Sequence, residues 1–159
     1  MATPTTEFQF GGLTKCLIQA GLLAENDAQV HIQEAKKKQV PLVSHLVTNK
    51  LVSGRSLATV ASTEFGVPFF DLDAIDVRSL PVKLISEKLI RKHQVLPLFS
   101  RGKSIFIAIS DPTSVQGLDE IKFQSRLTPE CILVEEDKLH KAIETALEAP
   151  DTAMADLLD

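Results

Sequence analysis

One pattern of 24 residues occurs twice in the first half of the chain. Residues 12–35 read GLTKCLIQAGLLAENDAQVHIQEA, residues 41–64 read PLVSHLVTNKLVSGRSLATVASTE, and KKKQV joins them. The copies align without a gap and match apolar residues with apolar residues. An internal repeat of this length indicates one supersecondary unit used twice. Each copy predicts a short helix, a tight break at Gly21 or Lys50, and a second helix. Because helices this short are marginal alone, the four are expected to pack together.

The composition is that of an ordinary globular protein. The chain has 159 residues, of which 44% are hydrophobic and 24% charged, enough for one domain or two small subdomains. No apolar run approaches the roughly 18 residues of a membrane span, and residues 1–10 lack a signal-peptide layout. We therefore expect a cytoplasmic protein with no direct membrane insertion. The two cysteines are far apart in sequence and predict neither a disulfide framework nor a zinc site.

The charge distribution argues against nucleic acid as a partner. The net charge is −4, and the chain has no Trp or Tyr on which bases could stack. Residues 83–103 are nevertheless basic, with six Lys or Arg against one Glu. This local surface either meets an acidic surface of another protein or is a solvated helix face.

The second half of the chain changes period and predicts a small α/β unit. Residues 84–93 have the apolar spacing of a helix, and the apolar runs 94–99 and 104–109 predict a hairpin that turns at Gly102. A helix capped by Ser114, a third strand at 131–134 and a closing helix at 137–147 follow, and Ala149-Pro150 is expected to end the last helix. The predicted fold class is α+β: a bundle of short helices formed by tandem 24-residue repeats, then an α/β subdomain with a three- to four-stranded sheet.

These patterns divide the chain into four segments. Residues 1–11 are expected to be a disordered leader and 12–66 a helical repeat subdomain. Residues 67–148 are expected to form the α/β subdomain, and 149–159 an acidic linker.

No catalytic or metal-binding motif is apparent. The sequence GGLTK at residues 11–15 lacks the spacing of a phosphate-binding loop, so the chain is not expected to hydrolyse ATP. The histidines are not spaced four apart and do not stand beside a carboxylate in a ligand pattern; they are His31, His45, His93 and His140. The expectation is that the chain has no catalytic residue and no metal site.

The doubled pattern resembles the N-terminal domain of the ATPases that drive type IV pilus extension and type II secretion, and is most similar to the pilus-extension branch. Residues 65–72, 95–98, 107–113 and 136–147 also look like the second half of that domain. The resemblance implies a non-catalytic regulatory domain. The ATPase core, with its ATP and Mg²⁺, would follow residue 159.

Some members of this family bind cyclic di-GMP through Arg, Gly and Gln residues placed at fixed positions of each copy. Here the polar half of that motif is replaced, at positions occupied by Gly12, Pro41, Thr14, Val43, Ala35 and Glu64. Guanine and phosphate need hydrogen-bond donors near the backbone, and Glu64 would repel the anion. Cyclic di-GMP is therefore expected to be an unlikely ligand, although a sensing domain with a degenerate site remains the alternative function.

The apolar half of the motif persists in both copies and gives the candidate site. Its residues are Leu13, Leu17, Ile18, Leu42, Leu46 and Val47. Because a short helix buries only one stripe of about 100°, the outward members are expected to form one patch that binds a partner. The alternative is that all six are core residues. The resemblance suggests as partners a PilZ-type regulator or the inner-membrane platform protein, besides the rest of the ATPase hexamer, at the cytoplasmic face of the inner membrane.

Overall fold

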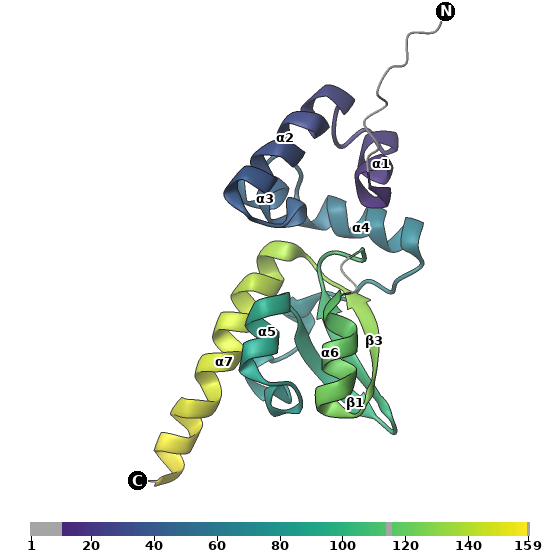
Figure 1. Ribbon diagram of the computed structural model, residues 1–159. Coiled ribbons are helices and arrows are strands. Elements are labelled where there is room, and N and C mark those ends of the chain that lie inside the picture. Colours follow the sequence, from purple (N-terminus) through teal and green to yellow (C-terminus); the bar gives the residue numbers. More distant parts are fainter. Residues whose placement is uncertain (1–10, 114–115, 159) are drawn as a thin grey trace, which may run out of the picture.

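The computed structural model describes residues 11–113 and 116–158, and it has two units stacked end to end (Figure 1). The first unit is the helical subdomain, made of α1 (Gly12–Gln19), α2 (Glu25–Lys38), α3 (Leu42–Thr48) and α4 (Gly54–Phe65). Each copy of the repeat thus supplies two helices, as predicted. Gly21 and Lys50, at equivalent positions, both have a left-handed backbone with φ of 76° and 58°.

Local sequence signals explain where these helices start and stop. Glu25 and Asp27 lie in the first turn of α2 and three lysines in its last turn, which complements the helix dipole. The Ser53 hydroxyl accepts a hydrogen bond from the Ser56 N–H and caps α4, and Gly66 ends that helix with φ of 65°.

The second unit, the α/β subdomain, contains a three-stranded sheet. β1 (Leu96–Arg101) pairs antiparallel with β2 (Ser104–Ile109) around Gly102, and β3 (Thr128–Leu133) pairs parallel with β2. The chain passes through α6 (Gln116–Ser125) between the parallel strands β2 and β3. A right-handed crossover is the usual connection between parallel strands. Phe69 forms an isolated parallel bridge with Leu133, so the segment before the sheet is extended. The α+β class and the three strands are confirmed, although β1 starts two residues later and β3 three residues earlier than predicted.

Helices and short turns enclose this sheet. Three 3₁₀ turns, η1 (Leu72–Ala74), η2 (Val77–Ser79) and η3 (Val82–Leu84), precede α5 (Glu87–His93). The last helix, α7 (Glu136–Leu158), contacts α3 and α4 near its start and the sheet farther along. One apolar cluster therefore runs through both units. In the part of the chain that the structure describes, no helix is long and apolar enough to cross a membrane.

Two predicted helix boundaries are wrong. The helix predicted at 84–93 starts later, because Ile85 is extended and the Ser86 hydroxyl accepts from the Leu89 N–H as a cap. The last helix does not end at Ala149-Pro150 but continues to Leu158. Pro150 removes one helical hydrogen bond at a cost of about 3 kcal/mol, but the φ of a proline is compatible with a helix and α7 continues through it. Two predictions, the leader at residues 1–11 apart from Gly11 and the Ser114 cap, lie outside the described residues.

Candidate partner-binding surfaces

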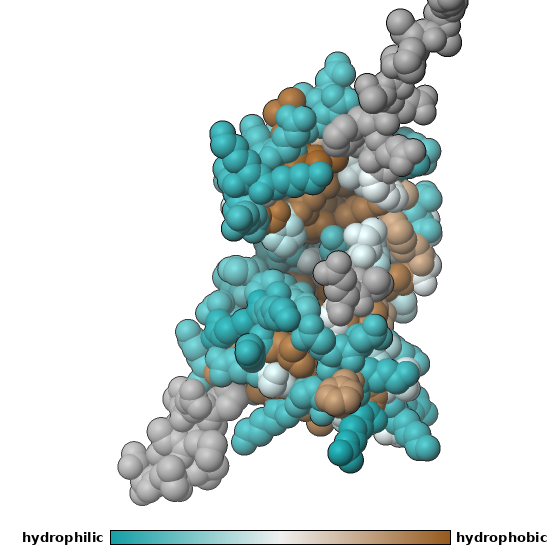
Figure 2. Space-filling model, in the orientation of Figure 1, coloured by the Kyte–Doolittle hydropathy of each residue, from teal (hydrophilic) through white to brown (hydrophobic). Residues whose placement is uncertain are grey.

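The six predicted site residues divide into two groups of three. Leu13, Leu17 and Leu46 are buried in the apolar core of the helical subdomain. The half-buried members pack against that core and keep some surface; they are Ile18, Leu42 and Val47. Only this second group can contact a partner in the folded domain. Figure 2 shows hydrophobic surface in a hollow of the helical subdomain, between α2 on one side and α1 with α4 on the other.

A cleft of about 780 Å³ lies between the two subdomains. The end of α3 and the turn before α4 form one wall, including Val47 and Lys50, while Gln94 and the start of α7 form the other. Of the six predicted residues, Val47 alone lines this cleft. The cleft is mostly apolar, with Glu136 and Asp137 on the α7 side and Lys50 on the opposite wall.

A carboxylate joins the two subdomains at the side of this cleft. Glu136, the first residue of α7, is buried, and the Ser44 hydroxyl of α3 donates to its Oε1 at 2.5 Å. The Ser110 hydroxyl, just after β2, donates to its Oε2. A carboxylate at a helix start also meets the positive end of the helix dipole. One side chain therefore holds α3, β2 and α7 together.

A second polar cluster surrounds Lys138 in the first turn of α7. Its ammonium lies 2.6 Å from Asp73 Oδ2, 3.1 Å from the buried Glu135 Oε2 and 3.2 Å from Asp71 Oδ1. Hydrogen bonds to Asp73 and Glu135 raise the pKa of Lys138 well above its usual range. The Asp73 backbone N–H, and then Lys138, lower the pKa of Asp71 below its ordinary value of 3.8.

The lowered pKa of Asp71 predicts a contribution to stability that acid removes. Its carboxylate stabilises the fold above pH 3.8, and this contribution is lost as the pH falls through the lower folded value. Asp71→Asn should therefore lower the urea midpoint at pH 7 by more than at pH 3, measured by circular dichroism. Asp76→Asn is the control, because Asp76 caps η2 in the same way without a lysine beside it. Equal losses at both pH values would contradict the assignment.

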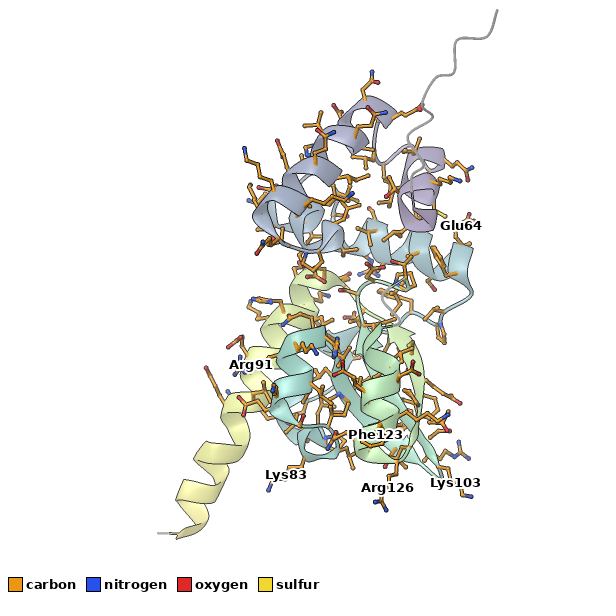
Figure 3. The ribbon with its side chains drawn as sticks, in the orientation of Figure 1. Glu64, Lys83, Arg91, Lys103, Phe123 and Arg126 are labelled. Carbon is orange, nitrogen blue, oxygen red and sulfur yellow. The ribbon has the colours of Figure 1, made fainter. Side chains whose placement is uncertain are left out.

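A basic and aromatic surface lies at the far end of the α/β subdomain. Figure 3 shows Lys83, Lys103, Phe123 and Arg126 at the end opposite the helical subdomain. Phe123 is 89% exposed. Among the described residues, no ion pair involves the three basic side chains. Unpaired cations around an exposed aromatic ring form a surface suited to an acidic partner. We call these four residues the basic end.

Comparison with known proteins places the chain in a family. A profile of the MshEN domain matches residues 65–153, more than half of the sequence. The chain belongs to the MshEN domain family. This MshEN domain is 43% identical over 151 residues to the type IV pilus assembly ATPase PilB of Pseudomonas aeruginosa, and 35% identical over 143 residues to PilB of Acinetobacter baylyi. The matches cover 95% and 90% of this chain but 27% and 25% of those proteins. The chain thus spans about a quarter of the length of these relatives.

Solved structures confirm the fold of the MshEN domain. The structure of MshE with cdg (cyclic di-GMP) has a TM-score of 0.63 at 20% identity and covers 85% of this chain and 98% of its own. The N-terminal domain of XpsE has a TM-score of 0.68 at 18% identity and covers 84% and 92%. The predicted resemblance to the N-terminal domain of pilus ATPases is confirmed by the PilB matches, and the solved structures confirm the fold.

Two features of this MshEN domain were not predicted from the sequence. Phe123 is exposed, and its position outside the apolar stripe of α6 was the only sign of this in the sequence. The histidine spacing predicted no metal site, yet His31 and Glu34 are three residues apart on α2 and His45 of α3 joins them. The spacing of His31 and Glu34 was visible in the sequence, whereas the approach of His45 required the packing of α3 on α2.

Proposed function

We propose that this MshEN domain is the non-catalytic interaction domain of a type IV pilus assembly ATPase. It works at the cytoplasmic face of the inner membrane, where it couples the motor to a PilZ-type regulator and to the platform protein. The identity to PilB over nearly the whole chain supports the choice of motor. ATP and Mg²⁺ would be bound by the ATPase core and not by this domain, and the core would assemble as the hexamer.

The observation that carries the proposal is that two candidate surfaces lie apart, one on the helical subdomain and one at the far end of the α/β subdomain. The hydrophobic hollow lies on the helical subdomain (Figure 2), and the basic end lies beyond the sheet (Figure 3). A domain with separate binding surfaces can contact two proteins at once. We assign the regulator to the helical subdomain, where Ile18, Leu42 and Val47 keep apolar surface. We assign an acidic surface of the platform protein to the basic end, because opposite charges favour that pairing.

Purified partners test both assignments. Val47→Asp introduces a charge at a half-buried position and should weaken capture of the PilZ-type regulator at least tenfold in calorimetry, while leaving platform binding unchanged. Phe123→Ser should do the reverse, because an exposed aromatic side chain is a common anchor of an interface. Each variant is the matched control for the other. The assignments would be contradicted if either variant lost both interactions, or if both variants kept both interactions.

Cyclic di-GMP is the second candidate ligand, because MshE was solved with it. Burial in this MshEN domain argues against the family's mode of binding. Thr14 and Val43, which stand where that mode needs glycine, are buried and place a side chain where glycine has none. Glu64 is exposed at the outer end of α4 (Figure 3). A calorimetric titration is expected to give no saturable heat at submillimolar cyclic di-GMP. Saturable binding would make the sensing function the better one.

A further inference from the structure

Three potential metal ligands converge between α2 and α3. His31 and Glu34 lie on the same face of α2, and His45 comes from α3. Their ligand atoms, two imidazole nitrogens and one carboxylate oxygen, all lie within 4.8 Å of one another. We propose that this cluster is a binding site for Zn²⁺ that joins the two copies of the repeat.

The distances suit tetrahedral zinc. Glu34 Oε2 lies 3.3 Å from His45 Nε2 and 3.5 Å from His31 Nδ1. Ligands about 2.0 to 2.1 Å from a tetrahedral zinc ion lie roughly 3.3 to 3.5 Å from each other. Two of the three ligand separations therefore already fit, and the third, between the two imidazole nitrogens, is no more than 4.8 Å. Two imidazoles and one carboxylate form a common zinc ligand set that leaves a fourth position for water.

The two imidazole nitrogens that face Glu34 have no other partner among the described residues. His31 Nδ1 and His45 Nε2 are buried and form no hydrogen bond, although Glu34 lies close to both. His45 as a whole is only 3% exposed. Buried polar atoms are nearly always satisfied, and these two nitrogens face the same carboxylate oxygen without hydrogen-bond geometry. A cation between them satisfies all three groups at once.

The second nitrogen of His45 sets a condition on binding. Its Nδ1 lies 3.2 Å from the Asn49 side-chain nitrogen, which also donates to the His45 carbonyl oxygen at 2.8 Å. Zinc on Nε2 requires the proton on Nδ1, so zinc binding requires the Asn49 amide to turn its oxygen toward the ring and to give up its hydrogen bond to the His45 carbonyl oxygen. Such an outer partner fixes the tautomer of the ligating histidine.

Calorimetry with ZnCl₂ on the full chain tests the proposal. We expect one Zn²⁺ per chain, bound through Nδ1 of His31 and Nε2 of His45 in ¹⁵N-resolved NMR spectra, and a higher unfolding temperature with zinc than without. His31→Ala should weaken binding by at least about 100-fold and abolish the shift in unfolding temperature, since even outer partners are worth 10- to 100-fold. Glu34→Gln, at an exposed position, should weaken binding at least about tenfold.

Two further variants test whether zinc binds to side chains outside this cluster. His140→Ala removes an exposed histidine of α7 and should leave zinc binding unchanged. The double variant Cys16→Ser, Cys131→Ser should also bind normally, although free thiols attract zinc. Absence of saturable binding, unchanged affinity in His31→Ala, or loss of binding in the cysteine variant would each overturn the proposal.

Discussion

Replacing Leu46 with aspartate is expected to unfold the helical subdomain. Leu46 has no exposed surface and lies in the core between the repeat copies. An ionised carboxylate placed there has no partner, and the loss should exceed about 4 kcal/mol, comparable with the stability of a whole small domain. Circular dichroism should show lower helicity at 25 °C and loss of the cooperative transition.

The neighbouring residue supplies the control for this prediction. Val47→Asp also replaces an apolar side chain with a carboxylate, one position along α3. Val47, however, is half-buried and lines the cleft. This variant should keep its helicity and a cooperative transition. If Leu46→Asp instead melts like the wild-type protein while capture of the regulator is lost, Leu46 belongs to the interface and not to the core.

Glu136→Ala should loosen the contact between the two subdomains. The carboxylate accepts hydrogen bonds from Ser44 and Ser110 in a buried position, and each hydrogen bond to a charged group contributes about 1.5 to 3 kcal/mol. We expect a loss of about 3 kcal/mol in the free energy of unfolding, measured by urea denaturation. Amide hydrogen exchange should also become faster at the start of α7.

Two other substitutions bracket this effect. Glu136→Gln keeps one acceptor and adds one donor, so both hydroxyls can still bond and the loss should be about half as large. Asp137→Ala removes the exposed carboxylate next to it and should change stability by no more than about 0.5 kcal/mol. If Glu136→Ala is as mild as Asp137→Ala, the buried bridge does not hold the subdomains together.

The sequence predicted the helical subdomain well because the same local signals occur twice. Gly21 and Lys50 stand at equivalent breaks, and the matched apolar residues form the core. The extent of α7 could not be predicted in the same way. A proline usually ends a helix, and the opposite outcome depends on the balance of propensities along 23 residues.

The candidate site was only partly predictable. The pattern marked six apolar residues but could not tell Leu17, which is buried, from Ile18, which is half-buried, because neighbouring residues of one short helix differ by about 100° in direction. Contacts between elements were not predictable either, because they depend on how the helices pack. His45 meets Glu34, and Ser44 meets Glu136, only once α3 packs on α2 and α7.

The length of α7 enlarges any change of angle at the start of the helix. Its first residue, Glu136, accepts hydrogen bonds from both subdomains, and the helix then runs away from that junction (Figure 1). A helix of 23 residues is about 34 Å long, so a tilt of roughly 5° at the junction moves the far end by about 3 Å. The first half of α7 packs on the α/β subdomain through Leu139, Ala142, Ile143 and Ala146, so that subdomain tilts together with the helix. A small change of angle between the two subdomains at Glu136 therefore grows with distance from the junction.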